Sequence, residues 1–173
     1  MRKVILNLAL SLDGYIEGPN GEYDWCFTDQ DYGMSELFER TDSIFIGRKS
    51  YEMSLGMEDI DTSWMPPKMK EYVFSNTLQT VKEGAVLVSG DLKSAVETIK
   101  SEPGKDIWLF GGADLTSAMV DLGLVDEFWL AVHPILLGSG KLLFSNLKAR
   151  VPLRLVDTKN WSSGLVTMRY TLA

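Results

Sequence analysis

Ser43-Ile44-Phe45-Ile46-Gly47-Arg48-Lys49-Ser50-Tyr51-Glu52 is the stretch that decides which fold the sequence predicts. Residues 43–46 have the apolar character of a buried strand, and a helix is expected to begin directly after Gly47. The first turn of a helix carries N–H groups without intrahelical partners and a partial positive charge, so it attracts anions. Gly47 would let a phosphate approach the backbone, Ser50 offers a hydroxyl, and Arg48 and Lys49 add positive charge. The motif predicts an anion site, with a solvated basic pair on a surface helix as the alternative.

Two further strand ends have related chemistry. In Leu109-Phe110-Gly111-Gly112-Ala113-Asp114 a strand enters a helix through two glycines, which suits either a tight turn or the close approach of a ligand to the backbone. In Phe74-Ser75-Asn76-Thr77 a strand ends in three small hydrogen-bonding residues, which taken alone indicate a turn. The carboxyl ends of parallel strands open at one edge of a sheet, so we expect the three turns to cluster there.

Apolar runs of strand length alternate with segments of helical period, which predicts an α/β protein. The expected strands cover residues 4–10, 43–46, 72–74, 86–88, 107–110 and 127–132, and the expected helices cover residues 32–40, 92–100 and 115–122 together with the helix after Gly47. Asp91 is a plausible N-cap for the helix over 92–100. Segments 153–156 and 165–170, separated by turn residues 160–164, predict an antiparallel pair at the sheet edge. We therefore expect one domain over residues 1–173, with three α/β/α layers, a mostly parallel mixed sheet and a C-terminal antiparallel hairpin.

Charge and composition exclude several classes of function. The net charge of −7 argues against nucleic acid or an anionic membrane as a partner. A single cysteine, Cys26, excludes an internal disulfide, and with a single histidine, His133, the chain lacks a usual zinc-ligand set, so no metal is expected. The apolar run near the start, residues 4–10, is too short to span a bilayer, so we expect a cytoplasmic protein.

Five segments, in their order along the chain, carry a resemblance to a known family: Ala9-Leu10-Ser11-Leu12-Asp13-Gly14-Tyr15-Ile16, Gly47-Arg48-Lys49-Ser50-Tyr51-Glu52, Phe74-Ser75-Asn76-Thr77, Gly111-Gly112-Ala113-Asp114-Leu115, and His133-Pro134-Ile135-Leu136-Leu137-Gly138-Ser139-Gly140-Lys141. The set resembles the dihydrofolate-reductase-like fold. Within that fold it is most similar to the reductase domain of the bifunctional riboflavin-biosynthesis deaminase/reductase and to its stand-alone relatives. The last segment resembles the Pro-x-x-x-Gly-x-Gly stretch of the riboflavin-type branch.

The resemblance implies an NADPH-dependent oxidoreductase that reduces a C=N or C=O of a pteridine, pyrimidine or related heterocycle, similar to 5-amino-6-(5-phosphoribosylamino)uracil reductase. The cofactor would be held by the residues that match the family's motifs: Ala9, Ile16, Gly47, Arg48, Lys49, Ser50, Ser75, Asn76, Thr77, Gly111, Gly112, Ala113, Asp114 and Leu115.

The sequence departs from the family after Glu52. Riboflavin reductases usually continue there into an Asp-x-Pro-x-Leu-x-x-Arg segment that helps to hold the ribose phosphate of the substrate. Here residues 53–61 read Met-Ser-Leu-Gly-Met-Glu-Asp-Ile-Asp, and the carboxylates of Glu58, Asp59 and Asp61 would repel a phosphate. The identity of the substrate therefore stays open.

A catalytic carboxylate is also implied by the resemblance. In dihydrofolate reductases an acidic residue near the start of the first helix hydrogen-bonds the pterin ring. Counting back from Gly47 places it at Asp31, whereas counting forward from Trp25 gives Gln30, and Asp29 is equally close. We assign the role to Asp31, with Asp29 as the second candidate; an N-cap is the alternative for each.

Three residues are candidates for the substrate side. Trp25 could form an apolar wall for a ring, Phe38 lies on the apolar face of the helix over 32–40, and Asp13 precedes Gly14 in a turn. A structural role is the alternative for each: a lid on the core, a core contact and a turn stabiliser. Cys26 has no nearby cysteine or histidine in the sequence and is not expected to be a nucleophile.

Two other functions remain open. A non-catalytic nucleotide-binding protein on the same fold would gain support if Asp29 and Asp31 both faced solvent. A dihydrofolate reductase is disfavoured by the segment 134–140 and by Ala131, which falls near a threonine that supports the acid in those enzymes. We also expect a homodimer, because the terminal strands carry more apolar residues than an exposed edge pair needs: Leu153, Leu155, Val156, Trp161, Leu165 and Val166.

Overall fold

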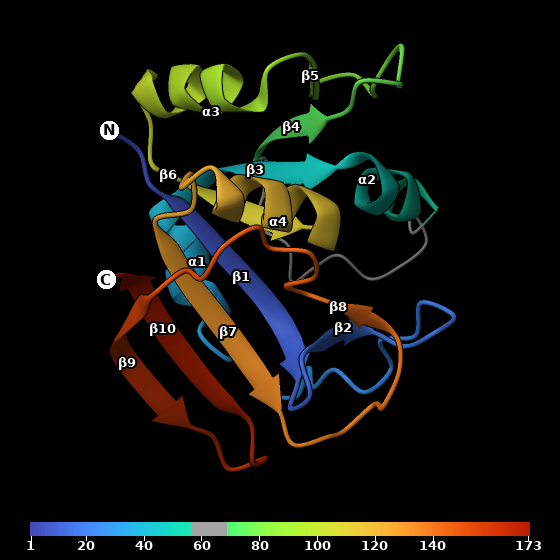
Figure 1. The fold of residues 1–173 in the computed structure, drawn as a ribbon, viewed down its shortest axis with the longest axis vertical. Helices are drawn as coiled ribbons and strands as arrows, with labels where there is room; N and C mark the ends of the chain where they lie inside the picture. The colour runs from blue at the N-terminus through green and yellow to red at the C-terminus, as the bar shows by residue number, and fades with distance from the viewer. Residues whose placement is uncertain (57–68) are drawn as a thin grey trace.

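The computed structural model describes residues 1–56 and 69–173 and contains an eight-stranded sheet (Figure 1). Its strands lie in the order β5-β4-β3-β6-β1-β7-β10-β9. The six strands from β5 to β7 are parallel, and β10 is antiparallel to both of its neighbours. The bounds are β1 Val4–Ser11, β3 Thr41–Gly47, β4 Lys70–Phe74, β5 Val86–Val88, β6 Asp106–Gly111, β7 Glu127–His133, β9 Leu153–Asn160 and β10 Val166–Leu172.

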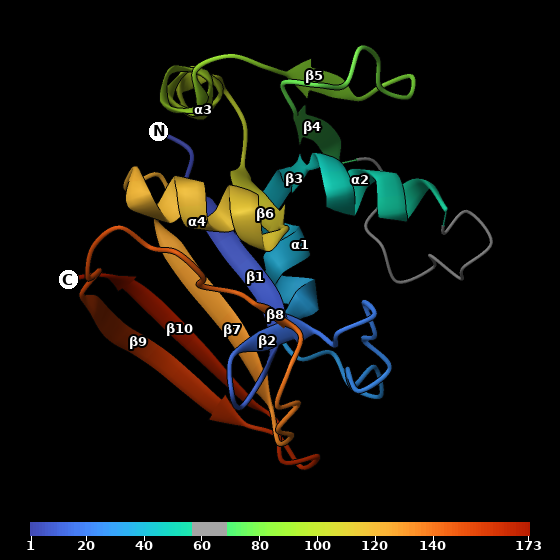
Figure 2. The ribbon, with the colours of Figure 1, turned by 45° about the vertical axis from the view of Figure 1, so that its right-hand side comes forward.

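Helices cover both faces of the parallel part of the sheet (Figure 2). Helices α3 (Leu92–Ser101) and α4 (Ala113–Asp121) bury Val96 and Met119 in the core of one face. Helix α1 (Met34–Arg40) buries Leu37 against the other face, where α2 (Arg48–Leu55) buries Tyr51. The three-layer α/β/α architecture and the mostly parallel mixed sheet are confirmed.

Side-chain alternation along β3 shows how one strand serves both cores. Phe45 packs with the cluster that includes the α3 and α4 residues, whereas Ile44 packs with the α1 residue Leu37 and Ile46 packs with Tyr51 of α2. Successive side chains of a strand point to opposite faces, so a continuous apolar run is what a strand covered on both sides requires. This is why the run 43–46 predicts a buried strand.

The C-terminal hairpin lies where the sequence predicts it. Strand β10 pairs with β7 and β9, and β9 forms the outer edge of the sheet. The N-cap prediction is confirmed as well, because Asp91 Oδ1 accepts a hydrogen bond from Ser94 N at 2.9 Å. Among the described residues, no helix is long and apolar enough to cross a bilayer.

A second, two-stranded sheet was not predicted. Strand β2 (Tyr15–Glu17) pairs in antiparallel fashion with β8 (Lys141–Leu142), through Tyr15 opposite Leu142 and Glu17 opposite Lys141. Strands of two or three residues give no periodic signal in the sequence. Their pairing depends instead on a long-range contact that composition does not reveal.

A cluster of charges holds the last residue of α1 against the start of β7. Glu127 accepts hydrogen bonds from Arg40, Lys3 Nζ at 2.9 Å and Trp129 Nε1 at 3.0 Å. Burial alone would raise the pKa of Glu127, but the hydrogen bonds from Arg40 and Lys3 outweigh it and lower the pKa to about 2. Glu127 therefore stabilises the fold as an anion.

The depressed pKa predicts how stability depends on acidity. The contribution of Glu127 is fully present above its unfolded pKa of 4.5 and is lost as pH falls towards its folded pKa of about 2. We expect the free energy of unfolding, measured in urea, to fall between about pH 6 and about pH 3 by roughly 1 to 2 kcal/mol more for wild type than for Glu127→Gln. Glu83→Gln, at an exposed carboxyl before β5, is the matched control and should follow wild type. Equal losses for wild type and Glu127→Gln would contradict the assignment.

Candidate functional site

The carboxyl ends of four parallel strands meet at one edge of the sheet. Gly47 at the end of β3 is paired with Phe74 at the end of β4, and Phe74 is paired with Val88 at the end of β5. On the other side of β3, Ile46 is paired with Gly111 at the end of β6. The turns that follow these strands are therefore neighbours, as the sequence predicts.

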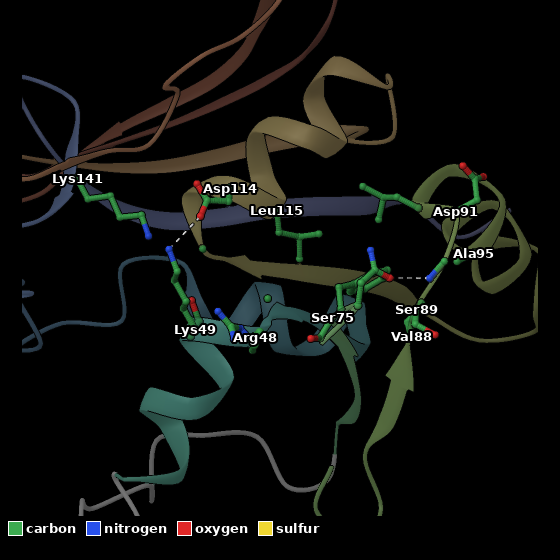
Figure 3. Close-up of a pocket in the computed structure, with 17 residues that line it drawn as sticks. Arg48, Lys49, Ser75, Val88, Ser89, Asp91, Ala95, Asp114, Leu115 and Lys141 are labelled. Atoms are coloured by element: carbon green, nitrogen blue, oxygen red, sulfur yellow. Dashed lines mark hydrogen bonds and ion pairs between the residues drawn. The ribbon is translucent and has the colours of Figure 1, made fainter. Parts of the chain in front are cut away.

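A cavity of about 360 Å³ lies between these turns and the helices that follow them (Figure 3). Its walls come from the starts of α2, α3 and α4, the turns after β4 and β5, and β8. The lining residues are Gly47, Arg48, Lys49, Ser50, Phe74, Ser75, Asn76, Val88, Ser89, Gly90, Asp91, Leu92, Ala95, Gly112, Asp114, Leu115 and Lys141.

Two of the three helix starts at this cavity lack a side-chain cap. Helix α3 is capped by Asp91, whereas the N-cap residues of α2 and α4 are Gly47 and Gly112, which have no side chain to accept from the first turn. The two uncapped starts are adjacent, since a Cβ built on Gly47 would lie 3.6 Å from Gly112 N. Their first-turn N–H groups form a paired donor set suited to phosphate oxygens.

Positive side chains gather at the same end of the cavity. Lys49 Nζ lies 3.5 Å from Asp114 Oδ2, but both side chains are largely exposed, so this ion pair is weak. The side chains of Arg48 and Lys141 form no hydrogen bond or ion pair with any residue in the described part of the chain. On a chain with a net charge of −7, three cations around two uncapped helix starts make a local anion site.

The other end of the cavity is polar but carries no cation among its lining residues. Asn76 Oδ1 accepts from Gly90 N at 2.8 Å, which joins the turn after β4 to the turn after β5. Ser75 Oγ accepts from Thr77 N at 3.1 Å and Leu78 N at 3.0 Å, which fixes its own turn. This end therefore offers hydroxyl, amide and backbone groups in a defined arrangement.

The cavity brings together most of the predicted cofactor residues. Those that line it are Gly47, Arg48, Lys49, Ser50, Ser75, Asn76, Gly112, Asp114 and Leu115, and those that do not are Ala9, Ile16, Thr77, Gly111 and Ala113. Ala113 is fully buried behind the turn, and the peptide bond between Gly111 and Gly112 is cis. Ala9 lies within β1 opposite Ala131, and Ile16 packs against the main core.

Both predicted catalytic carboxylates are exposed and hydrogen-bonded. Asp31 accepts from Ser35 N at 3.0 Å, Ser35 Oγ at 2.6 Å and Gly33 N at 3.0 Å, so it fastens the start of α1. Asp29 accepts from the Tyr32 hydroxyl at 2.5 Å. The hydrogen bond from Ser35 lowers the pKa of Asp31, and that from Tyr32 lowers the pKa of Asp29. Both are therefore carboxylates at neutral pH.

The substrate-side candidates lie outside the cavity. Trp25 is half-buried and its ring meets His133 edge to face, with 5.2 Å between ring centroids. Phe38 packs in the core beneath α1, with its ring centroid 5.9 Å from that of Trp108. Its observed contacts are those of the core.

Asp13 joins two loops that are far apart in the sequence. Its carboxylate accepts from Ser11 Oγ at 2.6 Å, Leu137 N at 3.1 Å and Gly138 N at 2.8 Å. The bond from Ser11 lowers the pKa of Asp13, and those from Gly138 and Leu137 add to the effect against the opposing influence of burial. These contacts are those of the predicted turn stabiliser, extended to the segment that begins at Pro134.

Residues 2–167 match the model of the RibD C-terminal domain family. The chain belongs to this family. It is 44% identical to the uncharacterized protein YyaP of Bacillus subtilis, over 98% of this chain and 94% of YyaP. A structure from Shewanella sp. PV-4, of a protein assigned to riboflavin biosynthesis, is 27% identical and superposes with a TM-score of 0.87 over 99% of both chains. Dihydrofolate reductase from Enterococcus faecalis, solved with NADP(H), shares the fold at 13% identity, with a TM-score of 0.70 over 98% of this chain and 96% of the enzyme.

Family membership and fold confirm the resemblance drawn from the five sequence segments. Within this family, the sequence predicts that the chain differs from the riboflavin reductases in the segment after Glu52. Glu58, Asp59 and Asp61 lie outside the described residues, so the predicted repulsion of a substrate phosphate stays a prediction.

Sequence reasoning missed two groups of lining residues. Ser89, Gly90 and Asp91 follow β5 and lead into α3, so they repeat the strand–glycine–helix pattern that marked Gly47 and could have been found by it. Lys141 gave no such signal, because it reaches the cavity from β8, whose pairing with β2 is not visible in the sequence.

Proposed function

We propose that this member of the RibD C-terminal domain family is an NADPH-dependent reductase of a pyrimidine, pteridine or related heterocycle, acting on a C=N or C=O bond. The observation that carries the proposal is the cavity that joins two uncapped helix starts and three cations to a polar end without a cation. This division suits a dinucleotide, whose pyrophosphate lies between two nucleosides. The additional phosphate of NADPH, on the adenosine ribose, would lie beside Arg48 between the two ends of the cavity. The NADP(H) complex of the distantly related dihydrofolate reductase supports the choice of cofactor.

The residues around the cavity fit that cofactor. First-turn N–H groups of α2 and α4 would bind phosphate oxygens, with Arg48 and Lys49 beside them. Because Gly112 has no side chain, the ligand could approach the backbone there; a Cβ would lie only 3.0 Å from Ser50 Oγ. Ser75 and Asn76 would contact the adenosine end. When bound, NADPH would supply the hydride.

On the substrate side, we propose that Asp31 orients the heterocycle as a hydrogen-bond acceptor, with Asp29 as the second candidate. Because the pKa of each carboxyl is lowered, neither is suited to donate a proton at neutral pH, but a carboxylate is a strong acceptor for a ring N–H. Trp25 would form an apolar wall beside the heterocycle. Asp13 would position the loop of Leu137, and Phe38 would position α1.

A second function, a nucleotide-binding protein without catalysis, is favoured by one observation. Asp29 and Asp31 are both exposed and both hold their own loop or helix through hydrogen bonds. Such carboxylates are sufficiently explained by local structure. Dihydrofolate reductase activity is the third candidate, and the match to the RibD C-terminal domain family does not favour it.

Substitution of Arg48 tests the cofactor. NADPH carries a phosphate that NADH lacks, and a guanidinium can bind it through two hydrogen bonds. We expect Arg48→Ala to weaken NADPH binding by roughly 10- to 100-fold and NADH binding much less, measured by quenching of tryptophan fluorescence. Arg150→Ala, at an exposed arginine away from the cavity, should leave both affinities unchanged. Equal weakening of both dinucleotides would contradict the assignment of Arg48 to the additional phosphate.

Asp31→Asn separates catalysis from helix capping. Asparagine caps a helix about as well as aspartate, so the free energy of unfolding should change by less than about 0.5 kcal/mol. If Asp31 orients the substrate, oxidation of NADPH with a pyrimidine or pteridine substrate should slow by roughly 10- to 100-fold at unchanged NADPH affinity. Asp29→Asn, measured alongside, ranks the two candidates. Full turnover by both variants would remove the carboxylates from the mechanism.

We further propose that the protein is a homodimer formed through the edge strand β9. Every residue of β9 is exposed, including Leu153, Leu155 and Val156, whereas Leu165 is buried and contributes nothing to this surface. Val156→Lys should shift sedimentation at micromolar concentration from dimer to monomer, and Leu122→Lys, at an exposed leucine after α4, should not. A monomeric wild type would end this proposal.

A further inference from the structure

Lys141 is a cation that reaches the cavity from outside the helix starts. It lies in β8 and is half-buried, and its side chain forms no hydrogen bond or ion pair with the described residues. Its Nζ lies 3.9 Å from the position that a Cβ on Gly112 would occupy. We propose that Lys141 binds the pyrophosphate of the dinucleotide at the Gly112 turn, and so links cofactor binding to the loops of the substrate side. This inference rests on the proposed function.

The backbone around Lys141 is held firmly against the segment after β1. Gly140 has φ +135°, and a Cβ there would lie 2.1 Å from Glu17 O, so only glycine allows this approach. Leu143 N donates to Gly14 O at 3.0 Å, and Asp13 accepts from Leu137 N and Gly138 N. A fixed backbone leaves the four methylenes of the side chain to position the ammonium group.

Two ammonium groups converge near Gly112 beside a single carboxylate. Figure 3 shows Lys141 and Lys49 extending from different walls towards the same region beside Asp114. Asp114 is the carboxylate nearest to them in this view, and its contact with Lys49 is long, at 3.5 Å. Like charges that converge repel each other, and the two negative charges of a pyrophosphate would relieve the repulsion.

The position of Lys141 assigns it to the pyrophosphate and separates it from Arg48. Arg48 lies between Lys49 and Ser75 in Figure 3, towards the polar end of the cavity, whereas Lys141 faces the uncapped start of α4. Lys141 would therefore bind a group that NADPH and NADH have in common. A phosphate on the substrate has the same chemistry, and titration of cofactor without substrate distinguishes the two sources.

The link to the substrate side passes through two sets of hydrogen bonds. The segment that carries Lys141 is bonded to the loop of Asp13, and His133, which precedes that segment, accepts from Phe27 N at 3.1 Å. The Phe27 loop contains Trp25 and leads to Asp29. An ammonium fixed on bound pyrophosphate would hold these loops in place.

The test compares NADPH and NADH affinities of wild type, Lys141→Met and Lys141→Arg by calorimetry. We expect Lys141→Met to weaken both dinucleotides by a similar factor, roughly 10- to 100-fold, and Lys141→Arg to retain most of the affinity. Lys148→Met, at an exposed lysine beyond β8, is the matched control and should bind as wild type does. Hydrogen exchange at residues 135–143 should slow on addition of NADPH in wild type but not in Lys141→Met.

Each result has one meaning for the proposal. Unchanged affinities in Lys141→Met would overturn the role of Lys141 and leave the proposed function intact. A loss of affinity confined to NADPH would also overturn that role, because it would assign Lys141 to the additional phosphate. A wild type that binds neither dinucleotide would instead overturn the proposed function. Retained affinity for both cofactors in Lys141→Arg, beside the loss in Lys141→Met, excludes a folding defect as the cause.

Discussion

The parallel register of β4, β3 and β6 is the constraint on which the site depends. Because Gly47 is level with Phe74 and Ile46 is level with Gly111, the chain must leave all three strands at the same height. Strands β3 and β6 lead directly into α2 and α4, whose N-termini open at that edge, and β4 leads into the turn of Ser75 and Asn76. The backbone alone thus concentrates unpaired N–H donors at one place, and the side chains only adjust what binds there.

The cationic side chains at this edge have the opposite sign to the net charge of the molecule. Acidic residues elsewhere give a net charge of −7, and some of them, such as Glu127, are neutralised in ion-pair clusters that hold the fold together. Arg48, Lys49 and Lys141 are left with weak ion pairs or none in the described part of the chain. Cations that stabilise nothing locally are available to a ligand. The net negative charge of the molecule also disfavours larger polyanions as ligands.

The sequence predicts the fold well because the parallel strands are buried on both faces and the turns after them contain glycine. Runs such as Ile44-Phe45-Ile46 leave little choice of structure, and Gly47 and Gly111 mark their ends. Predictions fail where structure depends on distant pairing: β2 and β8 are too short to be periodic, so Lys141 was not expected in the cavity. The substrate side is harder still, because a carboxylate such as Asp31 looks the same in the sequence whether it caps a helix or orients a ring.

The unequal capping of the three helices has a thermodynamic meaning. Helix α3 caps its own N-terminus with Asp91, so its first turn needs no ligand to accept from it. Helices α2 and α4 begin at glycines that offer no acceptor, so a bound phosphate would act as the missing cap for both at once. The free energy of unfolding then rises with ligand concentration, because the ligand binds the folded state. The lifetime of such a protein against proteolysis would rise and fall with the concentration of the ligand that supplies this phosphate.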